Sequence, residues 1–502
     1  MSAAAEKKKE GFSIRTSGIL MPVSSLPSRY GIGNLGEEAY RFVDFLKAAG
    51  QKYWQILPIG PTGYGDSPYQ SFSAFAANPY FIDPDILAEK GLLTREEIRA
   101  FPFGFDPEAV DYGVLFENRF ALLEKATARY DTKSAEFAAF RAENADWLAD
   151  YALFMALKEE HGMVSFHLWP EELIRREPEA LQKAEKRLEG RVRFWEIVQA
   201  LFYDQWFRLK DYAHKNGVRI IGDLPIYVSP DSSDLWAHSE LFQVDEAKAM
   251  TEVAGCPPDA FTDEGQYWGN PLYDWNFHRE TGFAWWLRRL SFAGKVYDVV
   301  RIDHFRGFES YYSIPATEKT AVHGKWRKGP GMELIRAVRK ELPELPIIAE
   351  DLGFLTAGVR RLLRQSGFPG MKVLQFAFDS REESDYLPHN YGHNSVVYTG
   401  THDNTTTEDW QYSAPSEDAA FARRYFGMTP QSDFTYCLIR AALGSVADTC
   451  VIPMQDYLRL GRKARINTPG TLGGNWRWRV KKEALTAELA GRIRALSKMY
   501  GR

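Results

Sequence analysis

The chain has 502 residues, of which 45% are hydrophobic and 26% are charged, so it has enough apolar side chains to bury a large core. Its net charge of −5 comes from positive and negative residues mixed along the chain, and no basic face stands out that would indicate a nucleic-acid partner. No apolar run reaches the roughly 18 residues that a membrane span needs, and no signal peptide is evident, which predicts a cytoplasmic protein without a membrane partner.

Apolar runs that fit buried β-strands recur along the chain, and helix-like sequence lies between most of them. Near-continuous apolar strands that alternate with helices predict a parallel sheet covered on both faces. Eight such runs favour a (β/α)8 TIM barrel of the α/β class over an open sheet. The runs are residues 18–26, 53–59, 219–228, 299–305, 346–351, 371–378, 395–403 and 450–458.

We expect residues 1–12 to be a flexible tail and residues 13–502 to form a single catalytic barrel. Two intervals are too long for simple connections between a strand and the next helix. The interval at about 66–191 is rich in Glu, Lys, Ala and Leu, which predicts a mainly helical insertion after the second strand. The interval at about 229–295 is rich in aromatic residues and glycine, which predicts a loop-rich insertion after the third strand.

Charged residues occupy the ends of several of these apolar runs, as in VVRIDHFRGF at residues 299–308. Side chains alternate across a strand with a period of two, so Arg301 and Asp303 share one face. In a parallel barrel the carboxyl ends of all the strands meet at one rim, where active sites lie. The acidic residues at or near the ends of the third, fourth, fifth and seventh runs are Asp223, Asp303, Glu350, Asp351 and Asp403.

A single carboxylate at a strand end is most simply a cap or the partner of a salt bridge. Carboxylates at the ends of four strands are harder to explain as structural, because crowded carboxylates repel one another and raise one another's pKa. Retaining glycosyl transfer needs this arrangement, with one ionised carboxylate that attacks the sugar and one protonated carboxyl that protonates the leaving oxygen. Arg301 would favour the ionised form of its neighbour Asp303. The strand ends therefore predict a catalytic rim.

The motifs VRIDHFRG, IIAEDLG and VVYTGTHDN resemble the strand motifs of the α-amylase superfamily, and in particular of its 4-α-glucanotransferases, the amylomaltases or disproportionating enzymes. The likeness covers nearly the whole chain in order. After Arg479 only one helix-like segment remains, so no C-terminal β-sandwich domain is expected. The other matching segments are residues 24–36, 65–83, 220–236, 254–275 and 465–479.

The resemblance implies an enzyme that transfers a segment of an α-1,4-glucan to the 4-hydroxyl of an acceptor glucose or glucan. The expected partners are maltooligosaccharides, starch and glycogen, as sugar donor and as acceptor. The expected chemistry is disproportionation, with cyclisation as a variant, through a covalent glycosyl-enzyme intermediate and with retained configuration. It uses no organic cofactor and no metal.

The resemblance also assigns roles to individual positions. Asp303 is expected to be the nucleophile, Glu350 rather than Asp351 the general acid/base, and Asp403 the carboxylate that stabilises the transition state. Strand periodicity alone does not choose between Glu350 and its neighbour. The expected substrate-binding residues are Arg301, His402, Asp223, Tyr69, Gln266, Trp268, Phe376, Asp379 and Asn467, with Tyr64 at a second glucan-binding surface. Residues 254–271 are expected to form a flexible lid over the cleft.

Two motifs suggest other chemistry and are set against this interpretation. GIGNLG at residues 31–36 matches a dinucleotide-binding pattern, but the segment SLPSRY stands between it and the apolar part of the preceding run, and Gln55 stands where an acidic residue would be needed. His389 and His393 have the spacing of zinc ligands on a helix, but Pro388 and Gly392 break any helix there.

Two further functions remain open from the sequence. A non-catalytic glucan-binding protein would be expected to have lost one of the three carboxylates, and this chain keeps all of them. An α-1,4-glucan hydrolase of the same superfamily would share every catalytic residue. The two activities differ in whether water or a sugar hydroxyl attacks the intermediate, and product analysis separates them.

Overall fold

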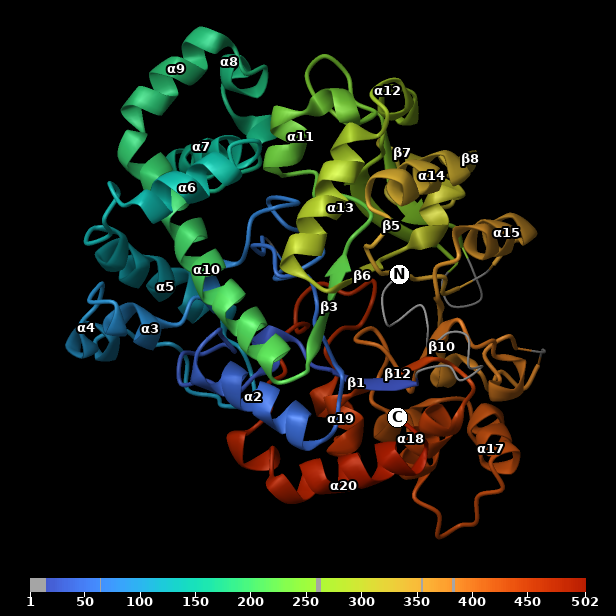
Figure 1. Cartoon of the computed structure of the whole chain (residues 1–502). Helices are drawn as coiled ribbons and strands as arrows, with labels where there is room; N and C mark the ends of the chain where they lie inside the picture. The colour runs from blue at the N-terminus through green and yellow to red at the C-terminus, as the bar shows by residue number, and fades with distance from the viewer. Residues whose placement is uncertain (1–14, 64, 259–262, 354, 382–383) are drawn as a thin grey trace.

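The computed structural model describes residues 15–63, 65–258, 263–353, 355–381 and 384–502 (Figure 1). Eight parallel strands close into a barrel in the order β1-β12-β11-β10-β9-β6-β3-β2, which confirms the predicted TIM barrel. Each predicted apolar run supplies one strand. The strands are β1 (Thr16–Leu20), β2 (Tyr53–Gln55), β3 (Arg219–Leu224), β6 (Val299–Ile302), β9 (Ile347–Ala349), β10 (Gly370–Val373), β11 (Ser395–Tyr398) and β12 (Thr449–Pro453).

The strands are shorter than the apolar runs that predict them. The run at 18–26 leaves the sheet after Leu20 and forms the 3₁₀ helix η2 (Val23–Ser25), which begins directly after Pro22. The run at 219–228 stops at Leu224, directly before Pro225. Proline has no N–H group to continue the ladder of hydrogen bonds. The remaining apolar residues line the loops at the carboxyl ends of the strands.

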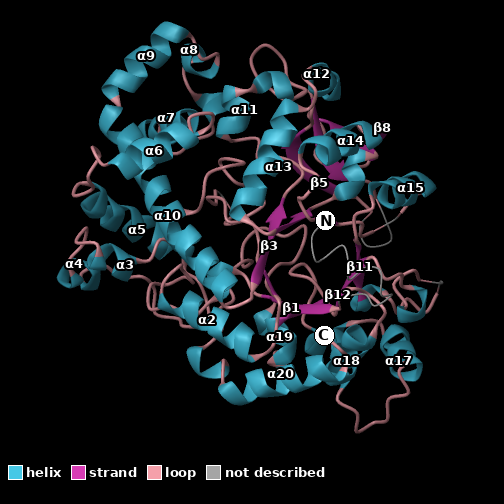
Figure 2. Cartoon of the chain, in the orientation of Figure 1, coloured by secondary structure: helices cyan, strands magenta, loops and turns pink. Residues whose placement is uncertain are grey.

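Helices surround the barrel, and Figure 2 shows them outside the strands. Their ends follow ordinary capping rules, as in α15, where the Thr356 side chain accepts a hydrogen bond from the Val359 N–H and Gly367 ends the helix with a φ of 65°. The helices in this layer are α2 (Glu37–Ala48), α10 (Glu189–Lys215), α13 (Ala284–Val296), α14 (Met332–Glu341), α15 (Ala357–Ser366), α16 (Thr407–Ser413), α17 (Ser416–Tyr425), α18 (Phe434–Gly444), α19 (Met454–Tyr457) and α20 (Ala487–Met499).

The segment 66–191, expected to be a helical insertion, is helical over most of its length. In Figure 1 its helices form a group to one side of the barrel. Its last element runs on into α10, which packs against α7 within the group and against α2 and β3 of the barrel. We propose that the segment is an insertion in one catalytic unit. Its helices are α3 (Pro84–Glu89), α4 (Arg95–Arg99), α5 (Tyr112–Thr127), α6 (Ala135–Glu143), α7 (Leu148–Glu160), α8 (Glu171–Ile174) and α9 (Pro178–Arg187).

The segment 229–295 contains a β-hairpin in addition to α11 (Ser233–Ala237), α12 (Trp275–Glu280) and α13. Strands β4 (Glu252–Cys256) and β5 (Gln266–Pro271) are antiparallel. They join β7 (Ser310–Pro315) and β8 (Lys325–Lys328) in a second sheet of order β5-β4-β7-β8. We call the pair of strands β4 and β5 the lid hairpin. The hairpin is therefore built on the chain that follows β6.

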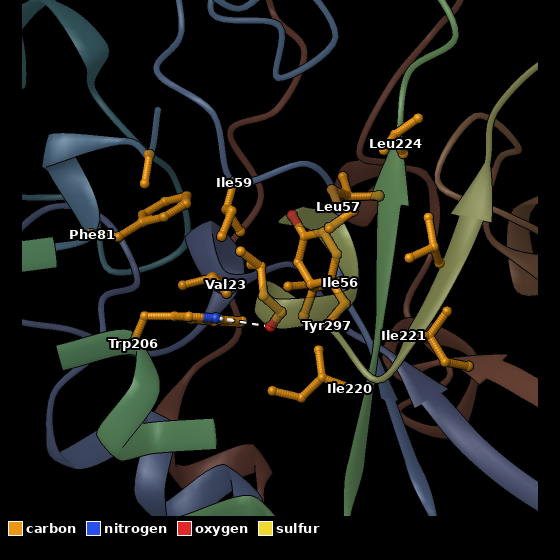
Figure 3. Packing of buried hydrophobic residues seen from close by; sticks show 14 of the residues in the cluster. Val23, Ile56, Leu57, Ile59, Phe81, Trp206, Ile220, Ile221, Leu224 and Tyr297 are labelled. Carbon is orange, nitrogen blue, oxygen red and sulfur yellow. Dashed lines mark hydrogen bonds between the residues drawn. The ribbon is translucent and has the colours of Figure 1, made fainter. Parts of the chain in front are cut away.

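The core between barrel and helices is dominated by aromatic and branched apolar side chains. Figure 3 shows Trp206 of α10, whose Nε1 donates a hydrogen bond of 3.0 Å to the Val296 carbonyl, beside Tyr297 and the side chains of β3. A Cβ on Gly222 would stand only 2.1 Å from the Tyr297 ring, so this position of β3 accepts glycine alone. This tight packing at Gly222 fixes the position of β3 at the residue that directly precedes Asp223.

Among the described helices, none is both long and apolar enough to cross a membrane.

Candidate active site

An ion pair across two neighbouring barrel strands forms the base of the site. The parallel register pairs Asp223 of β3 with Arg301 of β6. Arg301 Nη1 lies 2.6 and 2.7 Å from the two carboxylate oxygens of Asp223, and both side chains are almost fully buried. The same nitrogen donates a hydrogen bond of 3.1 Å to Asp303 Oδ1. Strand pairing thus places one guanidinium between two carboxyl groups.

Tyr69 connects this ion pair to the end of β11. Its hydroxyl donates to Asp223 Oδ2 at 2.7 Å and lies 2.9 Å from His402 Nε2. Because the carboxylate can only accept, the Tyr69 hydroxyl donates its single proton to Asp223. The hydrogen bond to His402 must therefore run from His402 Nε2 to the Tyr69 oxygen. Burial lowers the pKa of His402, which favours the neutral ring with its proton on that nitrogen. The Tyr69 and His402 rings are stacked, with centroids 5.3 Å apart.

Glu350 follows β9 and is held by two backbone N–H groups. The N–H of His304 donates to Oε2 at 2.6 Å, and the N–H of Leu352 donates to Oε1 at 2.7 Å. The backbone N–H of Glu350 in turn donates to the Ile302 carbonyl of β6. Both oxygens of this buried carboxyl are therefore fixed in direction by the backbone of two adjacent strand ends.

Asp403 is the most accessible of the three predicted catalytic carboxylates, with 44% of its side chain exposed. Asn467 Nδ2 donates to Asp403 Oδ1 at 2.7 Å, and His402 Nε2 lies 3.3 Å from the same atom. Arg465 donates to the Asp403 carbonyl at 2.8 Å. One carboxylate oxygen is thus engaged by the protein, and the side chain remains open to a ligand.

The cluster shifts the titration of its carboxyl groups. Burial raises the pKa of Asp303 well above its ordinary value; the charge of Arg301 opposes this shift, and the neighbouring carboxylates Asp223, Glu350 and Asp403 add to it. Burial also raises the pKa of Glu350, against the charge of Arg301 and the two backbone N–H donors. Asp303 is the one in direct contact with the guanidinium, and this charge favours its ionised form.

The groove residues predicted from the resemblance differ in their relation to this cluster. Gln266 and Trp268 lie on β5, joined by a hydrogen bond of 3.0 Å from the indole Nε1 to Gln266 Oε1. Trp268 reaches the cluster through the His304 ring, with centroids 4.8 Å apart. Phe376 is 41% exposed, and Asp379 forms a bidentate ion pair with Arg381; no contact in the described ranges joins either residue to the carboxylates. Tyr64 lies outside the described residues.

Two residues of the site were not assigned a role from the sequence. Trp476 lies against both Tyr69 and His402, with ring centroids 5.8 and 6.0 Å away. His304 directly follows Asp303, and its φ of 50° places it in the left-handed region. Burial lowers the pKa of His304 to about 3, so its ring is neutral. The position of His304 at a strand end was visible in the sequence, but the left-handed turn was not.

The histidines with zinc-like spacing do not form a metal site. His389 lies in a 3₁₀ helix, η8 (Pro388–Asn390), and its Nδ1 is 2.8 Å from the Tyr425 hydroxyl. His393 pairs weakly with Asp448 at 4.0 Å. Over the part of the chain that the structure describes, no group of three or more His, Cys, Asp or Glu side chains could hold a metal ion.

Comparison with known proteins agrees with this geometry. Residues 21–486 match the family described as 4-alpha-glucanotransferase. The chain belongs to the 4-alpha-glucanotransferase family. A 4-alpha-glucanotransferase of Clostridium butyricum is 48% identical over 485 residues, which covers 96% of this chain and all of the relative. One of Thermus thermophilus is 48% identical over 495 residues, covering 96% of this chain and 98% of that one.

Solved structures extend the comparison to the fold of this 4-alpha-glucanotransferase. The amylomaltase from Streptococcus agalactiae in complex with acarbose superposes with a TM-score of 0.95 at 43% identity, over 97% of this chain and 99% of that chain. The amylomaltase from Corynebacterium glutamicum shares the fold, with a TM-score of 0.80 at 19% identity. The enzyme is thus a glycosyltransferase that acts on α-1,4-glucans, and the hydrolase alternative is not favoured.

Proposed function

We propose that Asp303 is the nucleophile, Glu350 the general acid/base and Asp403 the stabiliser of the transition state in a double displacement. The observation that carries the proposal is the different environment of two neighbouring carboxyls at the ends of β6 and β9. Asp303 accepts a hydrogen bond from a guanidinium, whose charge favours its ionised form. Burial favours the protonated form of Glu350, and the two neutral N–H groups that bind it offset only part of this effect. Retaining glycosyl transfer requires this difference between its two carboxyl groups.

In the first half-reaction, the Asp303 carboxylate attacks the anomeric carbon of the sugar donor. The glycosidic bond breaks as Glu350 gives its proton to the leaving 4-oxygen, and a glycosyl ester on Asp303 forms. In the second half-reaction, Glu350 takes the proton from the 4-hydroxyl of an acceptor, whose oxygen attacks the same carbon and releases Asp303. Two inversions leave the α configuration retained, and Glu350 ends protonated as it began.

The neighbouring side chains would hold the reacting sugar. Asp403 has one oxygen fixed by Asn467 and one free to bind sugar hydroxyls, an interaction that strengthens as the ring flattens in the transition state. His402 offers a neutral, oriented ring at the same subsite. The remaining residues that we propose to line the substrate groove are Arg301, Asp223, Tyr69, Gln266, Trp268, Phe376 and Asp379.

We propose α-1,4-glucans such as maltooligosaccharides, starch and glycogen as both donor and acceptor. The activity for which the relatives are named and the acarbose complex of the streptococcal amylomaltase support this choice. Trp268 of the lid hairpin packs against the ring of His304, whose backbone N–H binds Glu350, and we expect it to exclude water and leave the intermediate to a sugar hydroxyl. We also propose a cytoplasmic location, in keeping with the small number and wide spacing of the cysteines in the sequence.

The test is incubation of the pure protein with maltotriose, with products resolved over time beside Asp303→Asn. We expect glucose and a ladder of longer maltooligosaccharides, a constant number of reducing ends, and no products from the variant. The melting temperature of the variant should equal or exceed that of the wild type, because the fold disfavours the charge that the amide removes. Rising reducing ends would indicate hydrolysis, and an active variant would exclude Asp303 as the nucleophile.

A further inference from the structure

His304 stands between the lid hairpin and the acid/base. Its backbone N–H donates to Glu350 Oε2 at 2.6 Å. Its ring meets the Trp268 ring edge to face, at 88° and with centroids 4.8 Å apart. One residue therefore contacts the lid hairpin through its side chain and the acid/base through its backbone.

The left-handed backbone of His304 makes both contacts possible. At φ 50° and ψ 47° the chain turns sharply after Asp303 and enters the 3₁₀ helix η6 (Phe305–Phe308). This conformation is unfavourable for a residue with a Cβ, so it persists only where the surroundings enforce it. The His304 Cδ2 atom lies 3.3 Å from where a Cβ on Gly307 would stand, so the ring is enclosed by the turn on one side and by Trp268 on another.

The lid hairpin is itself tied to the same segment. β4 pairs with β7 from Glu252 opposite Pro315 to Gly255 opposite Tyr312, and β7 begins two residues after η6 ends. The contacts thus form a closed circuit from Asp303 through His304, η6 and β7 to β4, then to Trp268 of β5 and back to the His304 ring. A displacement of the lid hairpin would therefore change the position of the His304 turn.

We propose that His304 is a positioning residue that couples the lid hairpin to Glu350, with Trp268 holding the ring and the ring holding the turn that aims the N–H at Oε2. This inference rests on the assignment of Glu350 as the acid/base. When the lid hairpin contacts His304, the His304 N–H donates to Glu350 Oε2. When the lid hairpin moves away, this hydrogen bond is lost. Proton donation to the leaving oxygen is thereby tuned to the closed cleft, from which water is excluded.

The measurable consequence is the pH at which the acid/base loses its proton. The His304 N–H stabilises the ionised form of Glu350, so its loss raises the pKa of that carboxyl. The alkaline limb of kcat/KM, which reports the protonated acid in the free enzyme, then moves to higher pH. Other charged or titratable groups also act on Glu350 and remain in place, namely Arg301, Asp303, Arg306, Asp351 and Tyr386.

The experiment is a pH profile of kcat/KM on maltotriose for His304→Asn, Trp268→Ala and the double variant. Asparagine tolerates the left-handed turn but removes the ring. We expect each single variant to move the alkaline limb up by about half to one pH unit, the size of a partly weakened charge-assisted hydrogen bond. The double variant should move it no further than a single one. Tyr267→Ala, the neighbour of Trp268 on β5, is the control and should keep the wild-type limb.

If the alkaline limb of kcat/KM stayed at its wild-type pH in His304→Asn, the turn alone would position the N–H, and the proposed coupling would be overturned. Additive shifts in the double variant would mean that Trp268 and His304 act separately, which also overturns it. Glu350→Gln tests the underlying assignment independently. This variant should be inactive on maltotriose yet form the glycosyl-enzyme from α-maltosyl fluoride, whose leaving group needs no proton. Full activity on maltotriose would instead refute Glu350 as the acid/base and leave the geometry of His304 unexplained.

Discussion

At the scale of single residues, Arg301 decides how the site titrates. Its Nη1 is shared by Asp223 and Asp303, and it is almost completely removed from solvent. A buried guanidinium keeps its charge, so it supplies a fixed positive potential beside Asp303, the proposed nucleophile. Burial and neighbouring carboxylates raise the pKa of Asp303, and this potential is what opposes them.

We expect Arg301→Gln to move the acid limb of kcat/KM up by about one pH unit or more and to lower kcat by about 100-fold or more. In the proposed mechanism Asp303 must be ionised to attack, so activity is lost as the pH falls through its pKa. In the wild type that pKa is already above the ordinary value of about 3.9, and without the guanidinium it rises further. Arg301→Lys keeps a charge and should show a smaller shift. An unchanged acid limb in the Gln variant would contradict this account.

Residue-scale prediction from sequence worked where strand periodicity and the family motifs agreed. Asp223, Arg301 and Asp303 meet as the shared face of neighbouring parallel strands requires. The two backbone N–H groups that donate to Glu350 could not be predicted, because these hydrogen bonds depend on the backbone direction at His304 and Leu352 rather than on their side chains. Sequence patterns carry little information about a single left-handed residue that is not glycine.

At the scale of elements, the lid hairpin shows how a loop prediction can miss strands. Residues 252–256 and 266–271 contain Gly255, Gly269 and Pro271, which weaken any local strand signal. The strands form because β7, more than fifty residues later, supplies a pairing edge. Non-local pairing of this kind is decided by tertiary contacts and not by propensity.

A charged residue of β4 anchors the lid hairpin to the neighbouring strands, so the effect of loosening the hairpin can be tested by mutation. Glu252 of β4 accepts hydrogen bonds from the Ser313 hydroxyl of β7 and, at 2.7 Å, from Arg327 of β8. We expect Glu252→Ala to loosen β4 from the sheet and admit water to the cleft. The ratio of hydrolysis to transfer on maltotriose should then rise several-fold, while the overall rate falls less than 10-fold.

The control for this prediction is Glu333→Ala, which removes a more exposed ion pair, to Arg279, outside the lid hairpin. That variant should keep the wild-type product ratio. If Glu252→Ala also kept the wild-type ratio, anchoring of β4 would not limit the entry of water.

At the scale of the whole molecule, barrel closure depends on contacts between the two ends of the described chain. β1 pairs with β12 over five residues, from Thr16 opposite Thr449 to Leu20 opposite Pro453. The Arg502 guanidinium reinforces this seam by donating to the carbonyls of Thr16 and Ala447, each at 2.8 Å. It links the start of β1 to the loop before β12.

We expect Arg502→Ala to lower the free energy of unfolding by about 1–3 kcal/mol, because it leaves several carbonyl groups without a charged partner. Urea denaturation should show the loss as a lower midpoint with an unchanged slope. Transferase activity at 25 °C should stay near that of the wild type, because the residue lies far from the carboxylates along the barrel strands. Arg492→Ala on the exposed face of α20 should leave the midpoint unchanged.

The sequence by itself determined the barrel, because eight apolar runs alternating with helix-like sequence favour a closed parallel barrel over an open sheet. It also determined which charged side chains reach the rim, because side-chain direction follows strand periodicity. Only the tertiary structure decided how the rim works. Tyr69 and His402, 333 residues apart, share a hydrogen bond, and the lid hairpin is linked to Glu350 through the His304 turn. These relations depend on the packing of distant segments and on the dihedral angles of one residue, and local sequence encodes neither.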